Sequence, residues 1–303
     1  MQDILKNKYL RRSFWIASGS ILLLLALIKI LIVGEVVQGS PEWLRFLSGV
    51  LQALIASFIT TAGIGAFIFY LTPKMDPKNG AEFLASYEFN DYFESALLAT
   101  SEWHFRGGFG RYLRTTVLPR LNTLASEGRA PITVKAQILN PQNQKLCELH
   151  ANLRNSVKNV DEKADWSSLD VKMNLYATIV ACAIYESNNQ YLDISVFLTN
   201  FFSTDRVDIS SASGIVTKED RKVPGIKFTK DSTHYKSYMG DLSVTQKQSD
   251  VVRRLPTKYK IGAISGDDVA KILKELDFVE SVFTPENLKS IAKLVNEGKN
   301  PYA

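Results

Sequence analysis

Residues 47–72 read LSGVLQALIASFITTAGIGAFIFYLT and carry no charged side chain. An α-helix rises about 1.5 Å per residue, so about 20 residues cross the roughly 30 Å hydrocarbon core of a bilayer. Pro73 follows directly, and a proline inside a helix removes one of the backbone hydrogen bonds. The stretch therefore predicts a membrane-spanning helix that ends before Pro73.

A second apolar stretch precedes this one, over residues 14–34, and Lys29 is its one charged residue. Between the two stretches, residues 39–41 read Gly-Ser-Pro, which is typical of a turn. A short connection between two spans makes them antiparallel. The sequence thus predicts a transmembrane hairpin within residues 1–78, with spans at about 14–34 and 47–72.

Basic residues around the two stretches predict their orientation. Four Lys or Arg side chains precede the first stretch, Arg45 lies in the connection, and Lys74 and Lys78 follow the second stretch. The positive-inside rule then puts both termini in the cytoplasm. A cleaved signal peptide is the alternative for the first stretch, but no A-x-A-like cleavage site follows it and a second span comes directly after.

Two features inside the predicted spans are candidates for assembly in the membrane. Gln52, Ala56, Thr60 and Gly63 follow helical spacing and form a small and polar stripe, here called the membrane stripe. It serves either the packing of the hairpin itself or contact between several copies. Lys29 lies near the outer end of the first span, where its amine reaches the interface or takes part in a pore or helix interface.

The whole chain has 303 residues, with 36 Lys or Arg against 31 Asp or Glu, and 46% hydrophobic residues. This composition excludes collagen-like and wholly disordered chains, and a net charge of +5 does not identify a nucleic-acid-binding protein. The two cysteines, Cys147 and Cys182, cannot form a disulfide framework, and both fall in helix-like patterns. We expect buried, reduced thiols in a reducing cytosol.

Residues 79–262 predict a cytosolic α/β domain. Alternating apolar residues predict strands at 132–138 and 192–198, with a partner strand for the latter at 207–209. Other patterns predict helices at about 112–125, 142–155 and 168–187, a strand or buried helix at 92–104, and edge strands at 215–216 and 226–228. The alternating order favours an α/β fold in which helices cover a central sheet.

Residues 263–303 predict a C-terminal helical hairpin. Ser265 and Asp268 form a capping-box pattern, and Thr284 with Pro285 is typical of the start of a second helix.

Glycines and arginines gather at Arg106-Gly-Gly-Phe-Gly-Arg111, with Arg114 close behind. Backbone flexibility, a helix start and guanidinium groups are the components of an anion site. The candidate ligand- or partner-binding residues are Arg106, Gly108, Gly110, Arg111 and Arg114. Three interpretations stay open: a turn with solvated arginines, a phosphate or nucleotide site, and a contact for protein or nucleic acid.

His234-Tyr-Lys236 followed by Asp241 has the spacing of the phospholipase D signature, in which a histidine attacks phosphorus and a lysine binds phosphate oxygens. No second copy of the motif occurs, and Ser232–Asp241 is more typical of a helix start than of a strand end. We therefore expect no catalytic residues, and keep His234, Lys236 and Asp241 as the alternative. Cys147 and His150 lack further ligands for a metal, so neither metal nor cofactor is predicted.

The chain resembles the two-transmembrane effectors of bacterial anti-phage defence systems, particularly those associated with retrons. The resemblance covers the hairpin and several motifs of the domain that follows it, namely Gly107-Gly-Phe-Gly-Arg-Tyr-Leu-Arg114, Leu118-Pro119, Leu139-Asn-Pro141 and Asp231-Ser-Thr-His-Tyr235. It implies a cytosolic domain similar to phospholipase D without a working catalytic pair. Residues 265–303 have no counterpart in it.

The same resemblance implies a function. Such an effector is a toxin of the bacterial inner membrane that causes abortive infection. A reverse transcriptase with its RNA–DNA product keeps it inactive until phage infection, and it then damages the lipid bilayer. Because two helices are too few to enclose an aqueous pore alone, we expect an active homo-oligomer unless the bilayer is disordered instead. Two alternatives remain: a membrane-tethered phosphodiesterase of phospholipase D type, and a membrane receptor for a nucleotide signal.

Overall fold

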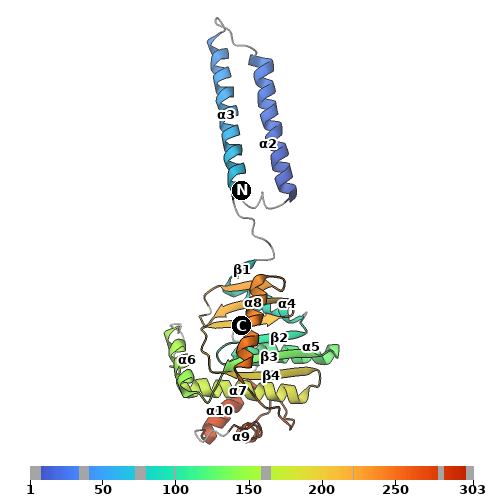
Figure 1. Cartoon of the computed structure of the whole chain (residues 1–303), viewed down its shortest axis with the longest axis vertical. Coiled ribbons are helices and arrows are strands. Elements are labelled where there is room, and N and C mark those ends of the chain that lie inside the picture. The colour runs from blue at the N-terminus through green and yellow to red at the C-terminus, as the bar shows by residue number, and fades with distance from the viewer. Residues whose placement is uncertain are drawn as a thin grey trace. The chain divides into compact units, whose positions relative to one another are not determined.

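The computed structural model describes residues 8–33, 41–71, 80–98, 100–157, 165–220, 222–278 and 283–297 (Figure 1). The chain divides into two compact units, residues 1–75 and 76–303.

The N-terminal unit contains α2 (Lys8–Ile28), which continues into the π-helical turn η1 (Lys29–Val33), and α3 (Glu42–Leu71). The two helices lie side by side and antiparallel (Figure 1). Within the described residues one helical segment, Glu42–Phe67, is long and apolar enough to cross a membrane, whereas the apolar segment Gly19–Leu31 is shorter. The structure thus supplies one candidate span, and the second span stays a prediction.

Several sequence predictions fall outside the described residues. These are the turn at 39–40, the outermost residues of both spans (Gly34 and Thr72), and the basic residues Lys74 and Lys78.

The second unit is a mixed α/β domain with an eight-stranded sheet in the order β1-β7-β6-β5-β2-β3-β4-β8. The neighbours β2, β3 and β4 are parallel, and every other pair is antiparallel. The strand bounds are β1 Ala81–Leu84, β2 Glu102–Arg106, β3 Ile132–Leu139, β4 Leu192–Thr199, β5 Asp205–Ser210, β6 Ser213–Lys218, β7 Gly225–Thr229 and β8 Asp250–Val251.

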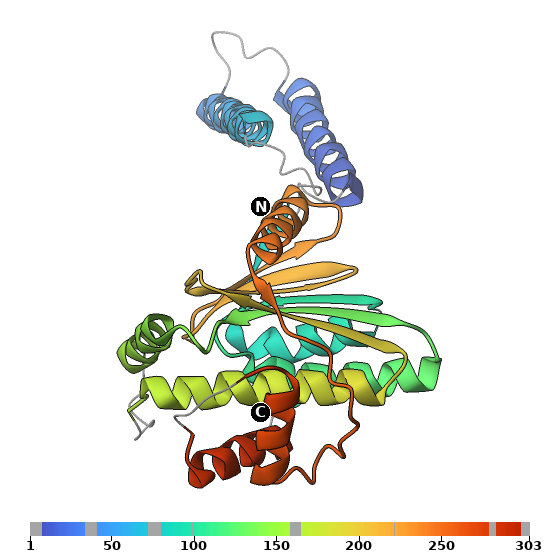
Figure 2. The same cartoon turned by 60° about the horizontal axis from the view of Figure 1, so that its bottom comes forward.

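Helices cover both faces of this sheet, as Figure 2 shows. On one face lie α4, α5 and α7, with α9 and α10 packed beyond α7, and on the other face lies α8. The helix bounds are η3 Ser86–Glu88, α4 Phe89–Leu98, η4 Leu113–Val117, α5 Leu118–Gly128, α6 Gln144–Ser156, α7 Ser168–Asn188, α8 Thr233–Lys247, α9 Gly266–Glu275 and α10 Pro285–Asn296.

The main core lies between the sheet and α4, α5 and α7. Trp103 and Phe105 alternate with polar residues along β2, so both aromatic rings enter this core. Phe93 of α4 packs its ring 6.2 Å from Trp103 and 4.6 Å from Tyr112, measured between centroids. Burial of each large apolar side chain contributes roughly 1.5–3 kcal/mol, so this layer is the main source of stability.

The strand neighbours differ from the sequence prediction. The segment 207–209 was expected beside the strand at 192–198, but β5 pairs with β2 and β6. The two expected edge strands, β6 and β7, are interior, and the edges are β1 and β8. An alternating pattern specifies which face of a strand is buried and leaves its neighbours undetermined, which explains the error.

The C-terminal helices share the main core. The capping box of Ser265 and Asp268 and the start of α10 at Pro285 are confirmed. Ile272 of α9 and Ile291 of α10 are fully buried, and their cluster is continuous with the core around α7. The predicted hairpin therefore forms the outer cover of α7.

Candidate functional site

The candidate loop lies where β2 ends, and the parallel strands β3 and β4 end at the same edge of the sheet. In α/β domains this edge commonly binds ligands. Here the loops after the strands bind one another: Asn140 N–H donates to the Thr199 carbonyl at 2.9 Å, and Asn143 Nδ2 donates to Asn200 Oδ1 at 3.1 Å. We call this place the strand-end edge.

Two of the predicted glycines are required by packing and by backbone conformation. A Cβ on Gly108 would lie 2.3 Å from His150 Cε1, so the imidazole rests directly on the loop. Gly110 has φ of +67°, which side-chain-bearing residues rarely adopt. The glycines thus serve the close fit of the loop against α6 and the turn into the next helix.

Aromatic rings fill the space beside the loop. His150 is 1% exposed, and its ring meets Phe109 and Phe202 edge to face at 5.2 and 6.0 Å. Phe109 stacks on Trp166 at 5.4 Å, and the Arg154 guanidinium lies 4.7 Å from the centre of the Trp166 ring. These side chains of the chain itself occupy the place that a ligand takes in many α/β proteins.

Charged groups at this edge are balanced in sign. Arg154 Nη1 donates to Glu219 at 3.0 Å, and Arg206 Nε lies 3.5 Å from Asp208 Oδ2. Burial raises the pKa of Glu219, but His150 and the two arginines outweigh it and hold this pKa below its ordinary value. Burial raises the pKa of Asp208 to about 6, against the opposing effects of Arg206 and Trp103. Burial also lowers the pKa of His150, against the opposing effect of Glu219.

The structure separates the predicted arginines. Arg106 points to the α8 face and pairs with Asp241. Arg114 is 2% exposed and donates hydrogen bonds to Asn174 and Thr178 of α7. Arg111 lies 3.8 Å from Glu297. Arg106 is therefore not part of a site with the other two.

Sequence reasoning missed the partners His150, Arg154, Glu219 and Arg206 at the strand-end edge. Each comes from a different part of the fold than the glycine loop, and α6, β5 and β6 bring them together. The sequence pattern relates His150 only to Cys147, three positions earlier, as a possible metal ligand. Cys147 is buried with its Sγ 3.7 Å from the Pro141 carbonyl, and the described residues contain no group of three metal-ligating side chains.

The phospholipase D-like residues lie on α8, whose N-cap is Ser232, so the predicted helix start is confirmed. His234 and Lys236 are exposed, and two positions along a helix are about 200° apart around its axis. Asp241 faces the sheet and Arg106. The three side chains do not converge.

Polar contacts hold α8 on the sheet around Asp241. Gln137 Nε2 donates to the Leu242 carbonyl at 2.8 Å, and Thr245 Oγ1 donates to Gln137 Oε1 at 2.7 Å. Tyr235 donates its hydroxyl hydrogen to the Ser210 carbonyl at 2.9 Å. Asp241 thus belongs to the attachment of the helix.

In the N-terminal unit, the membrane stripe faces away from α2. All four of its residues are exposed, and a Cβ on Gly63 would have no neighbour within 4 Å. The covered face of α3 instead contains Leu51, Ile55, Phe58 and Ala62. Packing within the hairpin therefore does not use the stripe.

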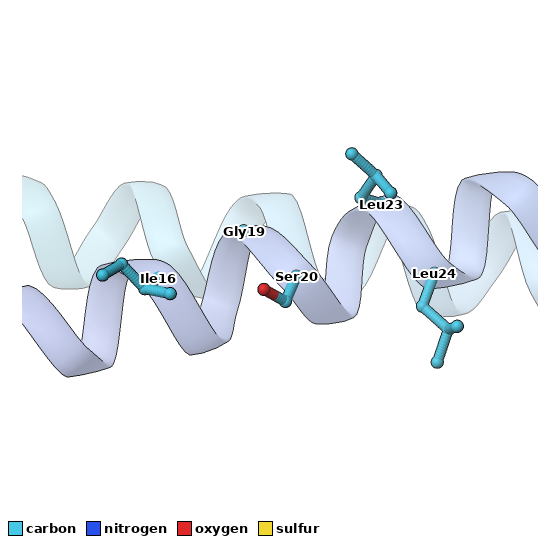
Figure 3. Close-up of a pocket in the computed structure, with 5 residues that line it drawn as sticks. All are labelled: Ile16, Gly19, Ser20, Leu23 and Leu24. Carbon is cyan, nitrogen blue, oxygen red and sulfur yellow. The ribbon is translucent and has the colours of Figure 1, made fainter.

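The outer face of α2 has a shallow apolar groove (Figure 3). It is lined by Ile16, Gly19, Ser20, Leu23 and Leu24. Lys29, the first residue of η1, is partly buried. Both helices thus leave small-residue surfaces uncovered.

Comparisons with known proteins add little to this picture. No family model and no curated protein matches the chain. Among solved structures, the chain is similar to TrmBL2, described as an archaeal chromatin protein with a novel mode of DNA binding, at 8% identity and a TM-score of 0.31. The match covers 68% of this chain and 66% of that chain. A TM-score this low is below the range of a shared fold, so the family of the chain is not established by similarity.

Proposed function

We propose that the protein is a membrane-embedded effector without catalytic activity, whose α/β domain receives a partner and whose helices act on the bilayer. The observation that carries this proposal is the exposure of the membrane stripe on α3, the candidate span. A helix that leaves small and polar residues uncovered in lipid is suited to pack against another helix.

Energetics favour assembly of several copies. The Gln52 amide is exposed, and a polar side chain inside a bilayer is costly unless it finds a partner. A hydrogen bond between helices in lipid contributes roughly 0.6–2 kcal/mol. Two helices are too few to enclose an aqueous pore, so a lesion in the membrane requires several copies or a disordered bilayer.

The cytosolic domain supports a binding role over phosphodiester chemistry. His234 and Lys236 lie on different sides of α8, and Asp241 is engaged with Arg106. A phospholipase D-type reaction needs a histidine and a lysine that meet at one phosphate. The phosphodiesterase alternative therefore has no specific observation in its favour.

The resemblance described above supports the biological setting of this proposal. We infer a toxin-like effector of a retron-type anti-phage system in the bacterial inner membrane, with both termini in the cytoplasm. A complex of reverse transcriptase with its RNA–DNA product is the partner that keeps it inactive, and homo-oligomers form after release. Damage to the membrane then ends the infection of the cell.

The test compares variants of the full-length protein in bacterial cells by dye uptake and membrane depolarisation. Replacing Ala56 and Gly63 by Leu keeps α3 apolar but prevents close approach of another helix, so toxicity should fall while membrane insertion persists. Thr60→Leu and Thr61→Leu form a matched pair, because each hydroxyl donates to the carbonyl four residues earlier. Only Thr60→Leu should reduce toxicity.

A truncation to residues 80–303 separates the effector from an enzyme. The effector proposal requires this soluble fragment to be harmless, since it lacks the membrane helices. Toxicity that survives the truncation, or equal dye uptake by the stripe variants and the parent, would contradict the proposal. Genomic proximity to a reverse transcriptase is the simplest check of the partner.

A further inference from the structure

Arg111 and Arg114 lie three residues apart at the start of the helical segment 111–128. The charge of Arg111 lowers the pKa of Arg114, so the two guanidinium groups repel each other. The N-terminal end of a helix also carries a partial positive charge, which disfavours cations. A nearby anion would offset both effects, so the two arginines indicate a position that favours anion binding.

Arg114 is buried without a carboxylate partner. Its Nη1 donates to the Asn174 carbonyl at 3.0 Å and to Thr178 Oγ1 at 2.8 Å, and its Nη2 donates to Asn174 Oδ1 at 3.4 Å. All these acceptors are neutral, and no described carboxylate comes within 4.0 Å. Burial and the charge of Arg111 together lower the pKa of Arg114 to about 10, against the opposing effect of Glu297. A buried charge is costly when no opposite charge compensates it.

Glu297 is the one described carboxylate near both arginines. Its Oε1 lies 3.8 Å from Arg111 Nη2, and its charge raises the pKa of Arg114. This separation exceeds hydrogen-bond distance, so the contact is loose. The preceding residue, Asn296, is firmly held, because its side chain accepts from Ile264 N–H at 3.1 Å and donates to the Ile264 carbonyl at 2.8 Å. Glu297 thus stays close to the arginines without binding them tightly.

We propose that Arg111 and Arg114 form a phosphate-binding site, and that Glu297 is a displaceable internal competitor for it. The ligand is free phosphate or a phosphate group of a nucleotide. A doubly charged phosphate balances two guanidinium groups better than one carboxylate does, and guanidinium groups match its oxygens geometrically. Binding displaces Glu297 at the end of α10, which couples the site to the C-terminal helices. The site is independent of the proposed action on membranes.

The experiment measures binding to the full-length protein in detergent micelles by calorimetry, at constant ionic strength. Inorganic phosphate and ATP serve as separate probes, which distinguishes free phosphate from a nucleotide. Glu297→Gln should bind the preferred probe about two- to fivefold more tightly, because the variant loses one partly exposed charge contact that competes with the ligand. Arg111→Gln should weaken binding by at least a similar factor.

The matched controls lie in α5, within the helical segment 111–128 that contains the two arginines. Arg120→Gln and Glu127→Gln make the same chemical changes within α5 and should leave the affinity unchanged, and circular dichroism of each variant checks folding. Arg114→Lys keeps the positive charge but removes the planar guanidinium with its paired N–H donors, so it should weaken binding in a folded protein. Binding of neither probe to the parent or to Glu297→Gln overturns the proposal, as does equal binding by Arg111→Gln. Dye uptake plays no part in this test.

Discussion

Substitution of Gly108 by alanine tests the closest contact at the strand-end edge. The new Cβ would lie 2.3 Å from His150 Cε1 and 2.7 Å from Nε2. The ring has little room to retreat, because it is 1% exposed and lies against Phe109 and Phe202. The protein must therefore shift either the loop or α6.

Overpacking of this kind costs about 1–3 kcal/mol. The unit formed by residues 76–303 has 228 residues, and for this size 1 kcal/mol lowers Tm by roughly 2–4 °C. Gly108→Ala should thus lower the Tm of this unit by roughly 2–12 °C. His150→Ala alone also destabilises the protein, since it opens a cavity. In the double variant, however, it removes the ring that the new Cβ of residue 108 would meet. The double variant should then lose at least about 1 kcal/mol less than the sum of the single variants.

Thermal unfolding of the full-length protein in detergent, followed by tryptophan fluorescence, provides the measurement, because Trp103 and Trp166 report on this unit. Gly240→Ala is the control: Gly240 lies inside α8 with no atom near its added Cβ, so alanine should raise stability by about 0.5–1 kcal/mol. A Tm for Gly108→Ala within about 1 °C of the parent, or strict additivity with His150→Ala, refutes the contact.

Four further predictions concern charge and topology. Because the folded-state pKa of Asp208 is raised to about 6, stability should fall as pH rises from about 4 to 6, and Asp208→Asn should flatten that slope in Tm against pH. His234→Ala should leave toxicity intact because the side chain is exposed, and loss of toxicity in a folded His234→Ala protein would favour the phosphodiesterase. Asp241→Asn should lower Tm, because it weakens the ion pair with buried Arg106 at a cost of about 1–3 kcal/mol. A periplasmic phosphatase fused after Ala303 should be inactive, and an active fusion reverses the predicted topology.

Local chemistry explains which parts of the fold were predictable. The alternation along β3 and the capping box of Ser265 and Asp268 depend on neighbouring residues, so both could be predicted from the sequence. The place of β5 between β2 and β6 depends on contacts between distant segments, which periodicity does not encode. The same limit applies to Gly108, whose reason for being glycine is a histidine 42 positions later.

Only part of the candidate site could be predicted, because a sequence motif does not specify where its side chains point. Arg106 ends a strand and alternates to the α8 face, while Arg111 and Arg114 begin a helix on the other side of the loop. The three arginines of the glycine–arginine motif therefore lie in two different places. Arg106 forms an ion pair with Asp241 of the phospholipase D-like motif. That one ion pair removes a cation from the candidate anion site and an acid from the alternative catalytic set.

The arginines that stay without a strong opposite charge determine where an anion can bind in the described part of this domain. At the strand-end edge, Arg154 and Arg206 have Glu219 and Asp208 as opposite charges, so an added anion gains little there. At Arg111 and Arg114, two guanidinium groups share one loosely held carboxylate. An approaching anion gains most where positive charge is least compensated. The charge balance, more than the glycine pattern, therefore directs a ligand to the start of the 111–128 helix.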